Sequence, residues 1–397
     1  MKDLICVIDI GSFKIRMLVV SKDEEGLKAV FKSEENSQGV KKGVVVNVEK
    51  VSRILRNLFS LALKSLDRKI SSAFVNLGGV HLFSVPTRAL ISVSRADQIV
   101  SEEDLNRVLQ EARALSVGQN KEVFDLVIKS YILDGENIRK EPIGLRGTRL
   151  EVEALALGCS SHYLESLKKV LLNSEIDSFE IIPLPLIYQK SILNEKQKEL
   201  GVCILDIGAQ TVSVSIFEEG NLSHFFVLPI GAQEITNKIA IQMQIDPEVA
   251  ERLKIEFGSC YFQGKNKREK IELEDGDYLI FYPRSLARII REGYSMIFDL
   301  VLKELKKISK DKKLPAGIIL TGGGAKMKKL VELAKAKFKL NCKIGRPKGI
   351  LNLEEDPALT TLLGLVFCSL EETKEEEGEL KRNIISKLKR FLRLFVP

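Results

Sequence analysis

The sequence lacks the long apolar runs that a membrane-spanning protein needs. No stretch approaches the roughly eighteen consecutive uncharged apolar residues of a spanning helix. Met1-Lys2-Asp3 leads directly into a strand-like apolar run, so we expect no secretory signal peptide. We therefore expect the chain to be cytoplasmic.

Histidine and cysteine are scarce. The three histidines, His81, His162 and His224, lie far apart with no second ligand at metal-binding spacing, which argues against a zinc site. The six cysteines include no Cys-x-x-Cys pair, and several lie in strand-like apolar runs. We expect them to be reduced, small core residues.

Most of the chain also lacks an excess of positive charge. The formal net charge is +7, but the last eighteen residues contain six basic and no acidic side chains, which leaves 55 basic and 54 acidic ones elsewhere. This balance argues against nucleic-acid binding by the folded part. A length of 397 residues, with 45% hydrophobic and 29% charged residues, is typical of a globular protein of two or three domains.

One pattern occurs twice. Residues 5–20, ICVIDIGSFKIRMLVV, and residues 202–217, VCILDIGAQTVSVSIF, each contain an apolar run, the tripeptide Asp-Ile-Gly and a second, alternating run. The pattern predicts two β-hairpins, each with a buried and a half-buried strand. Turn glycines let a ligand approach the backbone, neighbouring hydroxyls suit phosphate oxygens, and an aspartate at the strand end suits Mg²⁺. Two unrelated tight turns are the alternative, which the matched context in both halves disfavours.

A third glycine-rich loop follows a buried strand in residues 316–326, AGIILTGGGAK, and precedes a helix predicted at residues 327–338. Three glycines at such a junction allow a nucleotide to lie against the backbone beside a helix N-terminus. A tight turn without a ligand is the alternative.

Between the two hairpins, residues 83–158 combine strand-like runs with a capped helix that starts at Ser101. We interpret this region as an inserted α+β subdomain that contacts other proteins.

The end of the chain is acidic and then cationic. Residues 371–379, EETKEEEGE, are predicted to form a flexible linker. In residues 380–397 apolar side chains repeat at helical spacing and the polar side is exclusively basic, which is typical of an interfacial helix on an anionic membrane. Six basic residues contribute on the order of 5 kcal/mol to such binding. A terminal helix docked on the body is the alternative. The predicted membrane-contacting residues are Ile384, Ile385, Lys387, Leu388, Arg390, Phe391, Leu392 and Phe395.

Together these motifs resemble the FtsA family of bacterial division proteins, within the superfamily of actin, hexokinase and heat-shock chaperone ATPases. The resemblance covers nearly the whole chain and includes the runs ELGVCILDIGAQT, PIGAQEITNKIA, AERLKIEFG, PRSL and LPAGIILTGGGAKMKKL. It implies a duplicated actin-like (ribonuclease H-like) α/β fold, with a nucleotide cleft between two halves and an inserted α+β subdomain. The implied boundaries are 1–83, 160–198 and 350–370 for the first half, 84–159 for the inserted subdomain, 199–229 and 285–349 for the second half, 230–284 for its small subdomain, 371–379 for the linker and 380–397 for the membrane helix.

The resemblance also implies that ATP and Mg²⁺ bind between the halves, with Asp9 and Asp206 as metal ligands. Glu251 and Lys254 match adenosine-side positions, and their spacing places both on one helix face. The implied nucleotide-binding residues are Asp9, Gly11, Ser12, Lys14, Asp206, Gly208, Ala209, Gln210, Thr211, Glu251, Lys254, Gly322, Gly323, Gly324 and Lys326.

The second hairpin departs from the usual family pattern. Residues 208–213 read Gly-Ala-Gln-Thr-Val-Ser in place of Gly-Gly-Gly-Thr-x-Asp. The loss of two glycines and an aspartate argues against rapid ATP hydrolysis more than against ATP binding, so we expect slow hydrolysis at most. Gln189, just before this hairpin, is the candidate for positioning an attacking water.

The implied function is that of a polymerising tether at the division site, on the cytoplasmic face of the cell membrane. Its implied partners are a second copy, other division proteins and the C-terminal peptide of the tubulin-like protein FtsZ. Arg284 and Arg288 are the predicted peptide contacts, because an acidic, apolar peptide needs basic partners; a solvated basic helix face is the alternative. A PilM-like scaffold of a type IV pilus complex is the competing function, against which the amphipathic helix argues. A sugar or acetate kinase is disfavoured because no convincing general base is found.

The tail generates the first prediction. The full chain should co-sediment with anionic liposomes in the presence of ATP, and a chain ending at Glu371 should not, because it lacks the cationic amphipathic segment. Equal behaviour of the two chains, whether both bind or neither does, would contradict the proposed tether.

Overall fold

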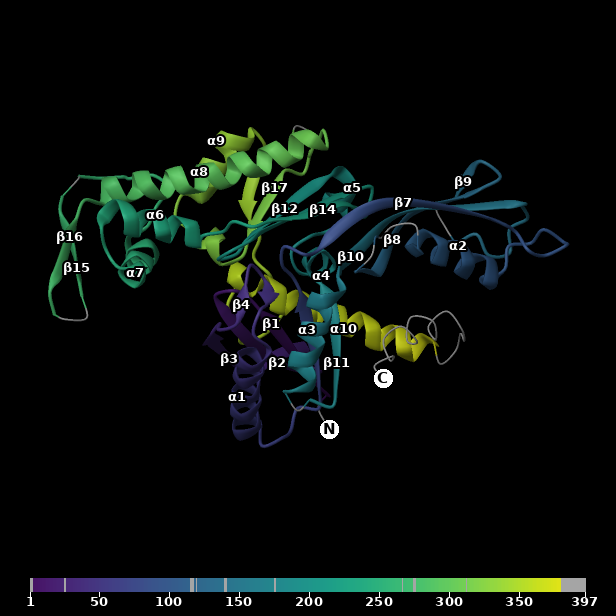
Figure 1. Cartoon of the computed structure of the whole chain (residues 1–397), viewed down its shortest axis with the longest axis horizontal. Coiled ribbons are helices and arrows are strands. Elements are labelled where there is room, and N and C mark those ends of the chain that lie inside the picture. Colours follow the sequence, from purple (N-terminus) through teal and green to yellow (C-terminus); the bar gives the residue numbers. More distant parts are fainter. Residues whose placement is uncertain are drawn as a thin grey trace.

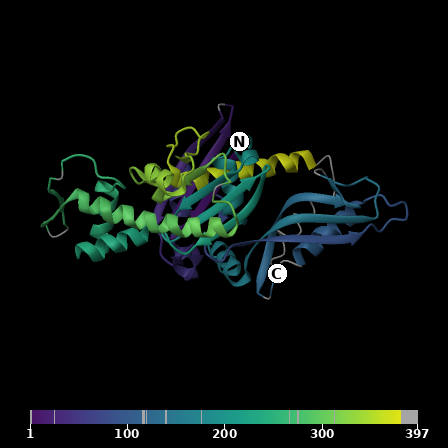
Figure 2. The same ribbon diagram turned by 90° about the horizontal axis from the view of Figure 1, so that it is seen from above.

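The computed structural model describes residues 3–379, apart from residues 25, 115–117, 119, 139–140, 175, 266, 274–275 and 312. The predicted membrane helix at residues 380–397 lies outside the described residues. Within the described part of the chain, no helix has the length and apolar character needed to cross a bilayer. Two sheet-containing halves meet at the centre of the molecule, with one extension on each side (Figures 1 and 2).

The first half is built on a five-stranded sheet in the order β11-β6-β1-β2-β3. Strand β1 pairs antiparallel with β2 and parallel with β6, and its central residues are fully buried. Helices α1 and α10 pack on this sheet, which explains the nearly continuous apolar run of β1. The strands are β1 (Asp3–Ile10), β2 (Lys14–Asp23), β3 (Gly26–Asn36), β6 (Ser72–Leu77) and β11 (Ser178–Pro183), with a small hairpin of β4 (Val40–Lys41) and β5 (Val44–Val45).

The second half repeats this arrangement. Its sheet has the order β14-β13-β12-β17-β18, again with a first hairpin, an antiparallel third strand and two parallel strands on the other side. The register also matches, because Asp9 pairs with Arg16 and Asp206 pairs with Ser213. The predicted duplicated actin-like fold is therefore confirmed. The strands are β12 (Val202–Ile207), β13 (Val212–Glu218), β14 (Asn221–Leu228), β17 (Ile318–Thr321) and β18 (Cys342–Ile344).

The predicted inserted α+β subdomain is present at one end of the molecule (Figure 1). One helix packs on a four-stranded sheet of order β7-β10-β8-β9, with a hydrophobic core of its own. The predicted cap is confirmed, since Ser101 Oγ accepts from the Asp104 N–H and Asp104 accepts from the Ser101 N–H. The elements are β7 (Phe83–Ser92), α2 (Glu102–Ala114), β8 (Lys121–Leu133), β9 (Glu136–Ile138) and β10 (Arg149–Ser160).

The other end carries the small subdomain of the second half. Helices α6 and α7 pack against the long helix α8, and the β15–β16 hairpin projects beyond them (Figure 1). The sequence did not indicate β15, because Ile271 is its one buried residue and the alternating apolar pattern is too short. The elements are α6 (Gln233–Met243), α7 (Pro247–Phe257), β15 (Glu269–Glu272), β16 (Tyr278–Phe281) and α8 (Pro283–Lys307).

The last helix is longer than predicted. Residues 357–359 form the short 3-10 helix η2, and α10 (Thr360–Glu379) includes the acidic segment predicted as a flexible linker. Glutamate and lysine have high intrinsic helix propensity, so this polar composition is compatible with helix. Close packing of α10 on α4 depends on Gly364, where a Cβ would lie 2.4 Å from Ile187 Cγ2. The remaining helices are α1 (Val48–Leu66), α3 (Ser161–Leu172), α4 (Leu184–Ser191), α5 (Glu195–Leu200), η1 (Gly323–Lys326) and α9 (Leu330–Phe338).

Candidate functional site

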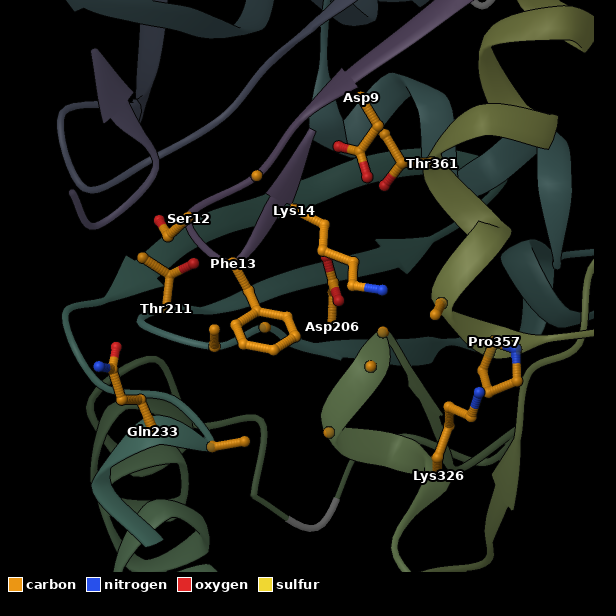
Figure 3. Close-up of a pocket in the computed structure, with 18 of the residues that line it drawn as sticks. Asp9, Ser12, Phe13, Lys14, Asp206, Thr211, Gln233, Lys326, Pro357 and Thr361 are labelled. Atoms are coloured by element: carbon orange, nitrogen blue, oxygen red, sulfur yellow. The ribbon is translucent and has the colours of Figure 1, made fainter. Parts of the chain in front are cut away.

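A cavity of about 1030 Å³ lies between the two halves, where the turns of both predicted hairpins face each other (Figure 3). Fourteen of the residues predicted from the sequence line it, although they come from four separate parts of the chain. They are Asp9, Gly11, Ser12, Lys14, Asp206, Gly208, Ala209, Thr211, Glu251, Lys254, Gly322, Gly323, Gly324 and Lys326.

The two hairpin turns have the same internal hydrogen bond. The Gly11 N–H donates to the Lys14 carbonyl at 3.1 Å, and the Gly208 N–H donates to the Thr211 carbonyl at 2.9 Å. A Cβ added at Gly11 would lie 2.9 Å from the Lys14 oxygen, and one at Gly208 would lie 3.1 Å from the Thr211 oxygen. Both turns are therefore tight at the glycine for the same steric reason, and the constraint is stronger at Gly11 than at Gly208.

Asp9 is a buried carboxylate at the end of β1. Its Oδ1 accepts from Asn76 Nδ2 at 3.0 Å, and Arg16 approaches its Oδ2 at 3.5 Å. Burial raises the pKa of Asp9 to about 6; the Arg16 charge opposes this increase and the Asp206 charge adds to it. The carboxylates of the two halves therefore lie close enough to repel each other.

Asp206 occupies the equivalent position at the end of β12. Burial raises the pKa of Asp206, while the hydrogen bond from Tyr188 and the charge of Arg16 act in the opposite direction. Tyr188 is fully buried, and burial together with the Asp206 charge holds its pKa well above the usual value. Its hydroxyl fixes the orientation of the Asp206 carboxylate.

This pair of carboxylates fits a Mg²⁺ ion. Two like charges on buried carboxylates are unfavourable by themselves, and a divalent cation would compensate both. No group of three or more His, Cys, Asp or Glu side chains with metal-binding geometry occurs among the described residues. An ion here would thus keep several waters or phosphate oxygens as ligands, which is the usual preference of Mg²⁺.

Arg16 is a cavity residue that the sequence reasoning missed. It lies directly opposite Asp9 on β2 and also donates to Glu34 Oε2 at 2.9 Å. Glu34 forms a second ion pair with Lys14, the cation that the motif predicted. The register of the hairpin was the available signal, because residues opposite each other on antiparallel strands point to the same face.

Glu251 and Lys254 lie together on α7, as their spacing predicted. The Lys254 ammonium donates to Glu251 Oε2 at 2.6 Å, to Thr236 Oγ1 at 2.7 Å and to the Ala232 carbonyl at 3.2 Å. Burial lowers the pKa of Lys254, and the Glu251 charge counteracts this change. The cluster ties α6 to α7 at the wall of the cavity.

The three glycines after β17 have different roles. Gly322 has a φ of +83°, and a Cβ there would lie 2.0 Å from Asp206 Oδ1. A Cβ at Gly324 would lie 2.5 Å from Ile207 Cγ2, so both glycines allow close packing on the second hairpin. Gly323 has open space around its Cβ position and lines the cavity. The middle glycine is therefore the one that leaves room for a ligand.

The segment after these glycines differs from the predicted helix at residues 327–338. A 3-10 turn, η1, comes first, and α9 begins at Leu330. Lys326, in η1, pairs with Asp356 at 2.6 Å. Asp356 also accepts from the Ala358 N–H at 2.8 Å, so Lys326 is held beside the start of η2.

Two residues predicted for the site lie outside the cavity lining. Gln189 does not line the cavity; its neighbour Tyr188 faces Asp206 instead, because successive residues of a helix point about 100° apart. Gln210 also lies outside the lining, and its side chain bridges Lys42 and Gln233. A sequence motif does not show which way either side chain points, because that direction depends on how the helix and the turn pack.

The predicted partner-binding arginines lie away from the cavity. Arg284 and Arg288 are in the first two turns of α8, which begins at the end of the small subdomain predicted for residues 230–284. Arg288 is exposed and lies 3.5 Å from Glu292.

Comparisons with known proteins agree with this architecture. The family model described as cell division protein FtsA matches residues 203–364, and that of the SHS2 domain inserted in FtsA matches residues 79–157. The cell division protein FtsA of Pseudomonas aeruginosa is 31% identical over 385 residues, which cover 94% of this chain and 91% of that protein. The chain belongs to the FtsA family. FtsA of Bacillus subtilis is 28% identical over 92% of this chain and 83% of its own length.

Solved structures extend the likeness of fold beyond the FtsA family. The type IV pilus biogenesis complex PilM–PilN gives a TM-score of 0.65 at 14% identity, over 92% of this chain and 98% of the matched one. MreB5 of Spiroplasma citri, solved with bound ADP, gives a TM-score of 0.59 at 13% identity, over 94% of this chain and 98% of the matched one. At these identities the likeness shows a shared actin-like fold.

The buried carboxylate generates a pH prediction. Burial raises the pKa of Asp9 from its ordinary value of 3.8 to about 6 in the folded chain. The folded state therefore binds this proton more tightly than the unfolded state does. The stability that proton binding contributes is lost as the pH rises from about 4 to about 6. A change of this size corresponds to roughly 3 kcal/mol. The ligand-free Asp9→Asn variant should therefore exceed the parent chain in unfolding free energy by up to about 3 kcal/mol at pH 7, and match it below pH 4.

Chemical denaturation across this pH range measures the difference. Asp177→Asn is the matched control, because Asp177 is an exposed carboxylate paired with Lys69 at the surface. A difference between the Asp9 variant and the parent that does not change with pH would contradict the prediction.

Proposed function

We propose that this protein binds ATP with Mg²⁺ in the central cavity, assembles into actin-like filaments and links FtsZ to the cytoplasmic face of the cell membrane at the division site. The matched pair of hairpins that face each other across the cavity carries the proposal. Two turns with the same glycine, the same internal hydrogen bond and the same preceding aspartate suit the two sides of a phosphate chain. Membership of the FtsA family supports the division role.

Each part of the cavity has a proposed task. The turns at Gly11–Ser12 and Gly208–Thr211 would hold the phosphates, and Asp9 and Asp206 would hold Mg²⁺, directly or through water. The cation would neutralise phosphate charge. The adenosine would lie between Gly323 and the Glu251–Lys254 cluster, where the lining combines backbone with a partly buried ion pair.

Hydrolysis is proposed to be slow at most. Ser213 stands opposite Asp206 where the family pattern has an aspartate, so this half of the site has one carboxylate fewer. Gln189, the predicted water-positioning residue, lies outside the cavity lining. Nucleotide would then serve mainly to hold the halves in an assembly-competent arrangement.

The two ends of the molecule and the tail would supply the contacts with partners. The FtsZ peptide would bind the small subdomain near Arg284 and Arg288, and the inserted subdomain would contact other division proteins. The cationic segment at residues 380–397, which lies outside the described residues, would contact the anionic membrane.

A PilM-like scaffold is the second candidate function. The structural likeness to the PilM–PilN complex supports it, with a TM-score of 0.65 over 92% of this chain. The sequence relatives favour division, because FtsA proteins match at up to 31% identity over nearly the full length. Binding of an FtsZ tail peptide distinguishes the two functions.

Gly323 allows a direct test of nucleotide binding. Its Cβ position is open and faces the cavity, so Gly323→Val should fold normally but fill space needed by the ligand. We expect at least about a tenfold loss of affinity for ATP with Mg²⁺, measured by isothermal titration calorimetry; that is about 1.4 kcal/mol. Gly118→Val, also at an open position but outside the cavity lining, is the control. Unchanged affinity in the Gly323 variant would place the nucleotide elsewhere.

A charge reversal tests the proposed peptide site. Arg288→Glu should weaken binding of an FtsZ C-terminal peptide by about five- to fiftyfold, since an acidic peptide loses an attractive charge and gains a repulsive one. Arg252→Glu is a matched control, because Arg252 has the same pairing with a glutamate four residues later, on α7. Fluorescence anisotropy gives both affinities, and equal losses would show a general charge effect instead of a contact at α8.

A further inference from the structure

The turn between β4 and β5 contacts the turns of both hairpins, β1–β2 and β12–β13. Its two residues, Lys42 and Gly43, have left-handed φ values of 52° and 73°, and their successive N–H groups point to different partners. The Gly43 N–H donates to Ser12 Oγ at 2.7 Å, within the first half. The Lys42 N–H donates to Gln210 Oε1 at 2.7 Å, which belongs to the second half. One short turn thus connects the two sides of the cavity.

This turn is firmly seated on the first half. The Val80 N–H donates to the Lys42 carbonyl at 3.2 Å, on the segment that follows β6. A Cβ added at Gly43 would lie 2.5 Å from Gly79 Cα, so the two backbones are in direct contact. Because the turn is fixed in this way, it cannot follow the second half if the cavity opens. The hydrogen bond to Gln210 must then break.

The amide of Gln210 is held in the orientation that this bond requires. Its Nε2 donates to Gln233 Oε1 at 2.8 Å, and Gln233 is the first residue of α6 in the second half. An amide has one accepting and one donating end, so the bond to Gln233 directs the oxygen toward Lys42. Gln210 itself does not line the cavity, whereas its partner Gln233 does, so the bridge lies beside the ligand's space.

We propose that Gln210 is a positioning residue that latches the second half onto the β4–β5 turn and slows the departure of a bound nucleotide. The latch is a property of the folded chain alone; its effect on departure rests on the proposed nucleotide site. A glycine or alanine at this position cannot reach Lys42, and that contact would be lost. A single neutral hydrogen bond of this kind changes an opening equilibrium by about three- to tenfold.

Two variants and one control test the latch in the full chain. Gln210→Leu keeps the approximate size of the side chain and removes the amide, and Gln210→Ala removes the reach as well. Lys42→Gly is the control, because the bond uses the backbone N–H, and glycine suits a left-handed φ. The Gly43 amide serves as an internal reference in every chain, since its acceptor Ser12 lies in the same half.

The first measurement is residue-resolved hydrogen exchange without nucleotide. In both Gln210 variants the Lys42 amide should exchange about three to ten times faster than in the parent, whereas the Gly43 amide should keep its rate. In the Lys42→Gly control, the amide at position 42 should stay protected once the intrinsic rate of glycine is taken into account. Unchanged protection of the Lys42 amide in the Gln210 variants would overturn the latch.

The second measurement is the dissociation of a fluorescent ATP analogue with Mg²⁺, followed by stopped-flow chase. Both Gln210 variants should release it about three to ten times faster, and the control should release it at the parent rate. Faster exchange with unchanged release would overturn the role of the latch in retaining nucleotide. If the parent does not bind the analogue, the proposed function fails, and hydrogen exchange alone decides whether the latch exists.

Discussion

Two carboxylates from separate halves of the chain share one buried cavity, and much of the surrounding structure compensates for this. Asp9 and Asp206 each end a central strand, and burial disfavours the charge of both. Asn76 and Arg16 contact Asp9, while the Tyr188 hydroxyl contacts Asp206. Two poorly solvated negative charges repel each other, and the proposed Mg²⁺ would compensate both of them.

The duplicated hairpin explains why this cavity can form at all. Each copy places its aspartate and its turn glycine at the same point of an equivalent sheet, so bringing the sheets together brings the two turns face to face. The glycines after β17 then allow the backbone to pack against the second aspartate, because a Cβ at Gly322 would collide with its carboxylate. Symmetry of the fold and close backbone packing together produce a polar site between two apolar cores.

The halves are not equivalent in chemistry, however. Opposite Asp9 stands Arg16, whereas opposite Asp206 stands Ser213. The first hairpin therefore carries its own countercharge, and the second depends on a hydroxyl from α4, an element of the first half. This asymmetry makes the second aspartate sensitive to how the halves are arranged.

The sequence alone determined the duplicated fold, the inserted subdomain and the three glycine-containing turns that line the cavity. These features follow from local patterns, since apolar periodicity sets strands and helices, and glycine with aspartate at a strand end marks a ligand turn. Tertiary structure decided the rest: Tyr188 rather than Gln189 reaches the site, Arg16 joins Asp9, and Gln210 contacts Lys42 outside the cavity. Those contacts join residues that are remote in sequence or depend on the register and rotation of packed elements, and no local pattern encodes which side chain will face its partner.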